Sequence, residues 1–370
     1  MRLKNINIVN FRNFESINIE PGRCFNILYG LNGQGKTNLL EAIYILGSSR
    51  SFRSTRLPDL IKHGETVGQI QGNIESGNSS SHIKLILESS GRRVDLNGKA
   101  IQKVSDLHGK LNTVVFSPDD TGMVKLGPET RRRYLDRAVY TGDIGYLYCW
   151  HEYNRILKQR NTLLKQIDKA GLEIWTEKLA IAGAEVITRR QRYVCLLNSL
   201  LQKHYATISG GTEIASIIYK PEGVQGADTE TICNELMVLF LKHAKNDEKF
   251  ATTTAGPHRD DLKFHLNSQP LKSLGSQGQQ KTFVLALKMA EIDNLESIYN
   301  EPPILLLDDI SSELDMDRKS NLLVFLDKRD LQTFITTTES SSALIRATSQ
   351  CAVFHVKHGN LTYKGNESNE

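Results

Sequence analysis

The sequence predicts an α/β fold in which an inserted helical subdomain interrupts a mixed domain of strands and helices. Three observations support this prediction. An apolar run over residues 24–29 is followed by a glycine-rich loop and then, over residues 38–46, by apolar side chains at helical spacing. Residues 150–200 carry apolar side chains at three- and four-residue steps, which predicts a short antiparallel helical pair. Strand and helix patterns return after residue 263, so the helical segment is an insertion.

The remaining elements follow from local patterns along the chain. Apolar runs bounded by turn residues predict strands at residues 3–19, 68–74, 82–87, 93–96, 112–116, 304–307 and 333–336. Asn97-Gly98 and Ser117-Pro118 supply two of the turns, and helical spacing returns over residues 281–298. We therefore expect a mixed α/β domain in two parts, residues 1–125 and 250–370, with a helical insertion at residues 126–249 between them.

Composition excludes several classes of protein. The chain has 370 residues, 39% of them hydrophobic, which suffices for one large or two modest domains with real cores. No apolar run approaches a membrane span and the start lacks a secretion signal, so we expect a cytoplasmic protein without a membrane partner. The five scattered cysteines suggest neither a disulfide framework nor a zinc site. With 46 basic and 42 acidic residues, any DNA surface must come from local patches.

The glycine-rich loop carries the strongest chemical signal. It matches G-x-x-x-x-G-K-[ST], whose backbone N–H groups wrap phosphates, and consists of Gly30, Leu31, Asn32, Gly33, Gln34, Gly35, Lys36 and Thr37. We expect Lys36 to hold the β- and γ-phosphates of ATP and Thr37 to ligate Mg²⁺. A chance glycine turn before a helix is the alternative, but the flanking strand and helix are those that the phosphate-binding mechanism requires.

Two carboxylates follow the apolar run 304–307. A nucleotide-hydrolysing site needs one acid for Mg²⁺ and another that orients or deprotonates water. We assign Asp308 to the metal and Asp309, together with Lys36, to catalysis. Taken alone, a strand that ends in two acids is more often a turn or a helix cap, so the assignment depends on the P-loop in the same chain.

A hydroxyl and a glycine precede the predicted helix 281–298, a placement that favours an anion at the helix N-terminus. The residues are Ser276, Gln277, Gly278 and Gln279. A plain Ser N-cap with a glycine turn explains them about as well, and what favours nucleotide contact is their order between the P-loop and the acidic strand.

This order is the arrangement of ABC-type ATPases, and the sequence resembles the RecF family across nearly its whole length. The matching segments are Phe11-Arg12-Asn13-Phe14, residues 30–37, residues 116–120, Arg131-Arg132-Arg133, residues 157–161, residues 256–261, Ser276-Gln277-Gly278-Gln279-Gln280, and residues 305–309 with Ser312-Glu313-Leu314-Asp315. The most specific are Gly-Pro-His-Arg-Asp-Asp at residues 256–261 and Ser-Gln-Gly-Gln at residues 276–279.

The resemblance implies an ABC/SMC-type P-loop ATPase head with an inserted helical subdomain. It also implies that two ATP-bound heads close face to face, so that Ser276 of one reaches the γ-phosphate held by Lys36 of the other, with Asp315 also in the nucleotide site. The implied role is ATP-driven homodimerisation on gapped or junction DNA in recombinational repair and replication restart. RecR- and RecO-type mediator proteins are the implied partners, and the protein would help to load recombinase.

The resemblance implies a weak, DNA-stimulated ATPase that serves as a switch, and two departures from the broader ABC pattern suggest slow hydrolysis. Asp309 is one methylene shorter than the usual Glu, and residues 333–338 lack the switch histidine of transporter ATPases. A structural SMC- or Rad50-like protein is the alternative, but the helical pair is too short for a long coiled arm. A transporter subunit is disfavoured by Gln277 and the missing histidine, and a GTPase by the lack of an Asn-Lys-x-Asp motif. We do not assign the glutamine that many such heads place near magnesium.

Basic clusters are the candidate DNA contacts. One group lies just after the P-loop helix and the other just before the helical pair: Arg50, Arg53 and Arg56, then Arg131, Arg132 and Arg133. A solvated charged face explains either group equally well. His258 and Arg259 are similarly open between a structural hydrogen-bonding corner and a ligand contact.

Overall fold

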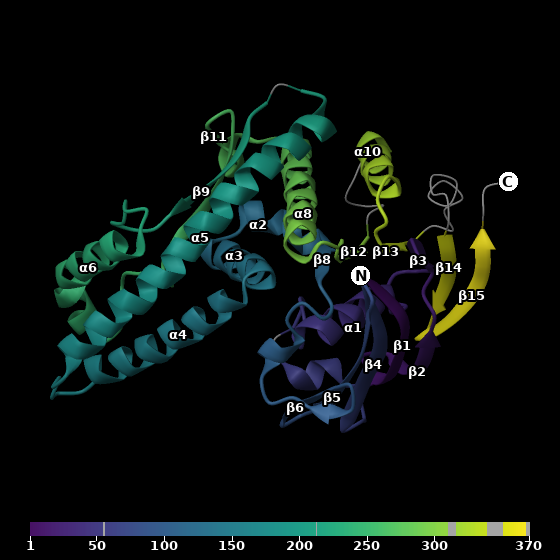
Figure 1. The fold of residues 1–370 in the computed structure, drawn as a ribbon, viewed down its shortest axis with the longest axis horizontal. Coiled ribbons are helices and arrows are strands. Elements are labelled where there is room, and N and C mark those ends of the chain that lie inside the picture. The colour runs from purple at the N-terminus through teal and green to yellow at the C-terminus, as the bar shows by residue number, and fades with distance from the viewer. Residues whose placement is uncertain (55, 212, 310–315, 339–350, 368–370) are drawn as a thin grey trace. The chain divides into compact units, whose positions relative to one another are not determined.

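The computed structural model describes residues 1–54, 56–211, 213–309, 316–338 and 351–367, and it separates into two compact units (Figure 1). The first unit combines Met1–Asp120 with Glu291–Glu370, and the second comprises Thr121–Ala290. Within the first unit, segments from both ends of the chain therefore fold together. No helix in the described parts of the chain is long and apolar enough to cross a membrane.

A six-stranded sheet in the first unit positions the nucleotide-site motifs. Its order is β15-β14-β3-β13-β12-β8, with bounds Asn360–Glu367, Cys351–Lys357, Phe25–Tyr29, Thr333–Thr337, Ile304–Leu307 and Thr113–Phe116. Strand β13 lies between β3 and β12 and is parallel to both. All four side chains of β12 are buried, as a strand covered on both faces requires. The carboxyl ends of β3, β13 and β12 therefore lie at one edge, where ligands of open α/β sheets bind.

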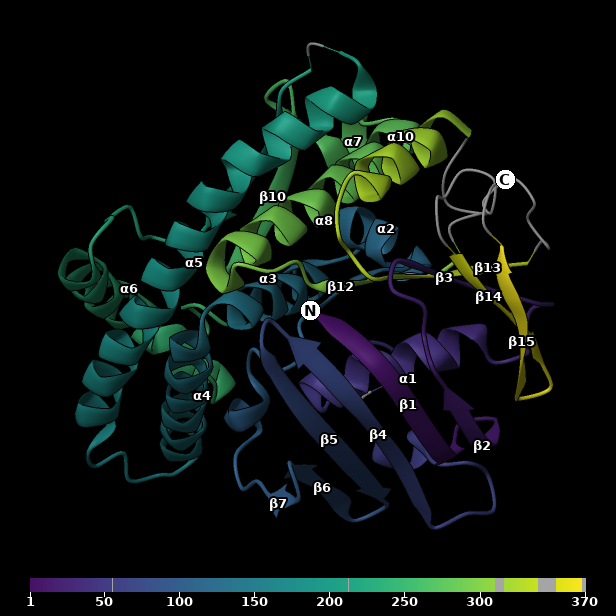
Figure 2. The same ribbon diagram turned by 45° about the vertical axis from the view of Figure 1, so that its right-hand side comes forward.

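A second, antiparallel sheet completes this unit, with α1 (Lys36–Ser48) behind β1, β4 and β5 (Figure 2). Its order is β2-β1-β4-β5-β6-β7, with bounds Phe14–Ile19, Arg2–Phe11, Val67–Ser76, Ser79–Glu88, Gly91–Leu96 and Lys99–Ala100. The pairing of β1 with β4 shifts register between Leu3 and Asn5. The irregularity changes the alternation of buried side chains along β1, so that Leu3 and Ile6, three residues apart, both face the core. Ile8 follows on the same face, and all three pack in the core with Leu40 and Ile43 of α1. Shorter elements are η1 (Leu57–Leu60), η2 (Val104–Leu107) and α10 (Met316–Asp327).

The second unit contains the predicted helical pair. Helices α4 (Ile144–Leu164) and α5 (Leu172–Ser209) pack along each other, and Gly171 begins α5 with a positive φ of 80°. The pair is confirmed, and the strand pattern expected near residue 263 corresponds to β10 (Asp261–Leu266). Sequence patterns missed other elements of this unit, which are α3 (Pro128–Gly142), α6 (Thr229–Phe250), α7 (Leu271–Leu274) and the two strands that flank β10 in the sheet β11-β10-β9, at Gln269–Pro270 and Ala215–Lys220. The two boundaries between the units fall within helices, one in α2 (Pro118–Lys125) and the other in α8 (Gln277–Tyr299).

The compact units do not share all boundaries with the predicted segments. The expected insertion ends at residue 249, whereas the second unit continues to Ala290. Strand β10 explains the difference, because it pairs with β9 from Asp261↔Lys220 to Leu266↔Ala215 and so holds residues after 250 in the second unit. The functional division into residues 1–125, 126–249 and 250–370 stays a prediction.

Candidate nucleotide-binding site

The P-loop connects β3 to α1 and depends on glycine at two positions. Gly30 has φ 153°, and a Cβ there would lie 2.3 Å from the carbonyl oxygen of Val356. Gly35, at the start of α1, has φ 115°, and a Cβ there would meet the side chain of Asn13 at 2.7 Å. Neither position accommodates a side chain without displacing its neighbours, so the motif glycines fit the close backbone approach that a phosphate-wrapping loop needs.

Lys36 folds back over this loop. Its Nζ donates to the carbonyl oxygens of Gly30 at 2.5 Å and Leu31 at 2.9 Å, and the residue is 8% exposed. Burial lowers the pKa of Lys36, while the charges of Asp309 and Asp308 oppose the shift. Lys36 is the only cation among residues 30–37, all of which the structure describes, and its ammonium group lies against the backbone at the start of the loop.

The structure brings together the two predicted magnesium ligands. The Thr37 hydroxyl donates to Oδ1 of Asp308 at 2.7 Å, and Thr336 on the intervening strand β13 donates to the same oxygen at 2.8 Å. Burial raises the pKa of Asp308, and these two hydrogen bonds and the charge of Arg53 oppose the rise. A hydroxyl and a carboxylate that meet at a phosphate-binding loop fit the oxygen ligands Mg²⁺ prefers.

Asp309 follows directly and has a left-handed backbone with φ 48°, a conformation that Asp tolerates better than most residues. Its N–H donates to the Thr336 hydroxyl at 2.8 Å. Thr336 thus bonds to both acids, a role that no local pattern at residues 333–338 indicates. Asp309 directly follows Asp308, which accepts the hydrogen bond from Thr37, so the proposed catalytic acid is adjacent in the chain to the carboxylate that meets the P-loop.

Gln34 of the P-loop is fixed by two other segments. The side chain of Asn13 donates to the Gln34 carbonyl oxygen at 2.8 Å, and Asn38 of α1 donates to Asn13 at 2.8 Å. In the turn between β14 and β15, the His358 N–H donates to Oε1 of Gln34 at 2.6 Å. Asn13 belongs to the Phe-Arg-Asn-Phe segment, whose resemblance was visible in the sequence although its contact with the loop was not.

Arg53 makes contacts beside the P-loop helix that differ from those of a free surface arginine. Its Nη1 donates to Asn38 Oδ1 at 3.0 Å and lies 3.8 Å from Glu41 Oε2. Glu41 is fully buried and accepts a two-pronged ion pair from Arg12 at 2.8 and 2.9 Å, as well as a hydrogen bond from Ser51. Arg50, Arg53 and Arg56 are all exposed, and their contact with DNA stays a prediction.

The second basic group contains one buried, one half-buried and one exposed arginine. Arg131 is 7% exposed and donates two hydrogen bonds, of 2.8 and 3.1 Å, to the Asp261 carboxylate. It also donates to the Leu126 carbonyl oxygen. A buried guanidinium with a bound carboxylate is unavailable to phosphate, so we remove Arg131 from the predicted DNA contacts. Arg132 donates to the Asp260 carbonyl oxygen at 2.8 Å, and Arg133 is exposed and pairs with Glu129.

Ser276 and Gln279 form a reciprocal cap at the start of α8. The Ser276 N–H donates to Gln279 Oε1 at 2.8 Å, and Ser276 Oγ accepts from the Gln279 N–H at 3.2 Å. Gln279 also donates to Glu213 at 2.7 Å, whereas Ser276 and Gln277 are exposed. This geometry shows the N-cap, and nucleotide contact by residues 276–279 stays a prediction. Asp315 lies outside the described residues.

His258 occupies a hydrogen-bonding corner, which favours the structural interpretation of this residue. Its Nδ1 lies 2.6 Å from the Tyr153 hydroxyl and its Nε2 lies 3.1 Å from the Thr253 carbonyl oxygen. Burial lowers the pKa of His258 to about 4, so the imidazole is neutral at pH 7. Arg259, by contrast, is exposed.

A P-loop after β3, paired acids after a neighbouring parallel strand, and a Ser-capped helix late in the chain define an ABC/SMC-type ATPase head. Comparison with known proteins is more specific. The family model "RecF/RecN/SMC N terminal domain" matches residues 2–362. The chain is 49% identical over 366 residues to the DNA replication and repair protein RecF of Trichlorobacter lovleyi, covering 99% of each chain. The chain belongs to the RecF family.

Solved structures agree with this assignment. A structure described as the recombination mediator protein RecF with ATP in the RecFOR pathway is 35% identical, with a TM-score of 0.89 and coverage of 98% of this chain and 99% of that one. The Smc head domain from Pyrococcus furiosus is 16% identical with a TM-score of 0.56, covering 99% of this chain and 96% of that one, a likeness of fold alone.

Proposed function

We propose that this chain is an ATP-dependent DNA-binding protein of recombinational repair and replication restart. The observation that carries the proposal is the hydrogen bond between Thr37 and Asp308, which joins the P-loop to the acidic strand beside the Lys36 ammonium group. The solved relative described with ATP supports ATP as the nucleotide. The protein would act in the cytoplasm as a slow ATPase, and the nucleotide bound to it would control whether it binds or releases DNA.

Each residue of the site has a distinct task in this proposal. The loop N–H groups of residues 30–37 wrap the phosphates, and Lys36 exchanges its carbonyl partners for phosphate oxygens. Thr37 and Asp308 hold Mg²⁺, which would neutralise phosphate charge. Asp309 orients the attacking water and accepts its proton. Its short side chain supports slow turnover, since it reaches one methylene less far than Glu.

Closure of two heads would complete the site. Ser276 and Gln277 are exposed at the start of a long helix, so their hydroxyl and backbone groups are accessible to a second subunit. In a homodimer, Ser276 of each subunit would contact the γ-phosphate held by Lys36 of the other, and Asp315 would line the shared site. ATP then stabilises the dimer because it is bound by both partners.

DNA is the proposed substrate of the closed dimer. Arg50, Arg56 and Arg133 are exposed, and Arg53 links the same basic loop to Asn38 and Glu41 beside the P-loop. Gapped or junction DNA is the proposed target, and RecR- and RecO-type mediators that load recombinase are the proposed partners. The description of the solved relative as a recombination mediator of the RecFOR pathway supports this assignment.

Sedimentation velocity tests the proposal directly. The protein is run alone, with ATP and Mg²⁺, with a gapped duplex, and with both. We expect a dimer on DNA in the last sample and its loss when EDTA removes Mg²⁺. An intact blunt duplex serves as the control for target preference. Equal sedimentation with and without ATP would contradict the switch, and equal binding to both duplexes would contradict the preference for gaps.

A further inference from the structure

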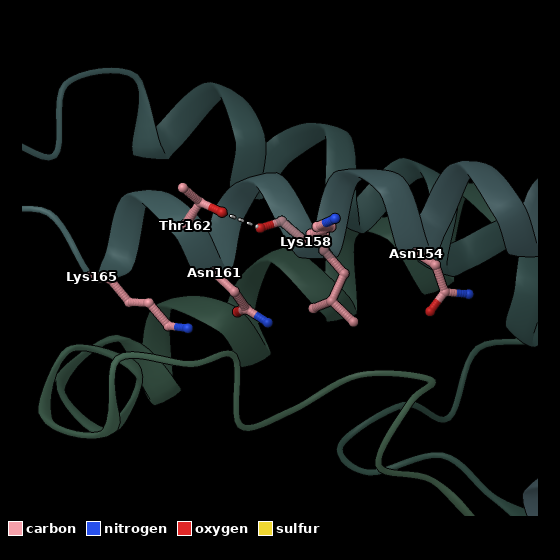
Figure 3. Close-up of a pocket in the computed structure, with 6 residues that line it drawn as sticks. Asn154, Lys158, Asn161, Thr162 and Lys165 are labelled. Carbon is pink, nitrogen blue, oxygen red and sulfur yellow. Dashed lines mark hydrogen bonds between the residues drawn. The ribbon is translucent and has the colours of Figure 1, made fainter. Parts of the chain in front are cut away.

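A shallow groove of about 400 Å³ follows one face of α4 in the second unit (Figure 3). Its lining residues are Asn154, Leu157, Lys158, Asn161, Thr162 and Lys165. They recur at three- and four-residue steps and therefore form one stripe along the helix. The stripe contains two lysines and no acid.

No ion pair joins either lysine to another described residue, and two acids of the helical pair and α6 are paired with other cations. Glu152 pairs with Arg155 at 2.6 Å, and Glu248 pairs with Lys169 at 3.2 Å. The lining of the groove is thus positively charged, with two lysines, no acid and no ion pair to either lysine among the described residues. Charge complementarity selects an anionic occupant.

Asn161 adds a donor of fixed orientation. The Thr253 N–H and the Thr253 hydroxyl both donate to Oδ1 of Asn161 at 2.7 Å. The Thr253 N–H can only donate, so the Asn161 atom that faces it is the carbonyl oxygen, and the Thr253 hydroxyl donates to that oxygen while it accepts a bond of 2.7 Å from Arg160. The carbonyl end of Asn161 therefore faces the loop at Thr253, and its NH₂ group is turned away from that loop.

This arrangement is rigid because its base is buried. Arg160 is 3% exposed and pairs with the fully buried Asp247 at 2.8 Å. The Asn154 amide donates a hydrogen bond of 2.7 Å to the Trp150 carbonyl oxygen, and the Thr162 hydroxyl donates one of 3.0 Å to the Lys158 carbonyl oxygen. The donors that remain for a ligand are the ammonium groups of Lys158 and Lys165, the amide NH₂ of Asn161 and the second N–H of the Asn154 amide.

We propose that this groove binds the sugar-phosphate backbone of DNA, a contact that rests on the proposed function and adds a site on the helical pair. Seven residues of α-helix separate Lys158 from Lys165 by about 10 Å along the axis. That spacing suits an extended polyanion with successive phosphates better than one small anion. Such contacts fix position on DNA without reading its sequence.

The test removes the two charges from the full-length protein. Lys158→Gln with Lys165→Gln is compared with Lys203→Gln with Lys263→Gln, which removes two exposed lysines of the same unit outside the groove. A fluorescent gapped duplex is titrated by anisotropy with ATP and Mg²⁺ at several salt concentrations. We expect the groove variant to bind about 5- to 30-fold more weakly near 0.15 M salt, with a salt slope smaller by about 1 to 2.

The control pair should retain the parental affinity and slope, and the groove variant should keep ATP-dependent dimerisation. Parental affinity and slope in the groove variant would overturn the groove assignment while leaving the proposed function intact. A parental protein that does not bind the duplex at all would instead contradict the proposed function. A groove variant that binds DNA normally but loses an acidic mediator protein would replace DNA with a protein as the occupant and overturn the inference.

Discussion

The Thr37 hydroxyl donates a hydrogen bond of 2.7 Å to Asp308, 271 residues later in the chain. Thr336 bonds to the same carboxylate oxygen from the strand between them. The oxygens proposed to hold Mg²⁺ are therefore brought together by sheet pairing between segments far apart in the sequence.

Lys36→Ala is expected to abolish ATP binding at micromolar nucleotide while the fold survives. The phosphates lose a charge-assisted donor, and such bonds contribute on the order of 1.5–3 kcal/mol each. Calorimetric titration measures the affinity, and circular dichroism with thermal melting checks folding. Lys84→Ala, outside the P-loop on β5, is the matched control. A folded Lys36→Ala protein with parental affinity would remove the basis of the nucleotide site.

Asp309→Asn is expected to lower turnover far more than ATP affinity. The amide keeps the shape of the side chain but cannot accept a proton from water, so hydrolysis should fall by 10²-fold or more. The ATP-bound dimer should then persist on DNA. Phosphate release and the lifetime of the DNA complex are measured together. Parental hydrolysis by this variant would mean that another acid activates the water.

Ser276→Arg is expected to leave ATP affinity nearly unchanged and to block closure of two heads. The exposed position at the start of α8 tolerates the larger side chain, but a bulky cation would obstruct a second subunit. ATP-dependent dimerisation and hydrolysis should therefore fail together, as measured by sedimentation and phosphate release.

A mixture of two inactive variants tests whether the ATP site is shared between subunits. In a heterodimer of Ser276→Arg with Lys36→Ala, one composite site is intact and the other carries both defects. Partial hydrolysis by the mixture, above the sum of the two separate variants, is expected if the site is shared. Normal dimerisation and turnover by Ser276→Arg alone would contradict a shared site.

His258 is expected to make stability depend on pH between about 4 and 6.5. Burial lowers the pKa of the folded-state imidazole from 6.5 to about 4, so the unfolded chain binds more protons within this window. Stability therefore falls as pH falls, by roughly 3 kcal/mol over the full window. Urea unfolding of the parent and of His258→Gln measures it. The variant should show a flatter dependence, and identical slopes would contradict the assignment.

Patterns that depend on neighbours in the chain could be predicted from the sequence. The P-loop, the apolar strand before Asp308 and the helical pair follow from glycine placement and hydrophobic periodicity, which act over one or two turns or strands. The resemblance to the RecF family was also visible, because its motifs are short and keep a fixed order. Lys36, Thr37, Asp308 and Asp309 consequently entered the site by sequence alone.

Tertiary structure decided which side chains meet across large separations. Arg131 looked like its neighbour Arg133, but pairing of β10 with β9 extends the second unit beyond residue 249 and presents Asp261 to Arg131, which buries it. Thr336 joined the two acids only because β13 inserts between β3 and β12. The sequence by itself determined the chemistry available in this protein, since residue type and local spacing set it. Which side chains contact each other, and which are buried, was decided by the fold. Both depend on strand register and on packing between residues that lie far apart in the sequence.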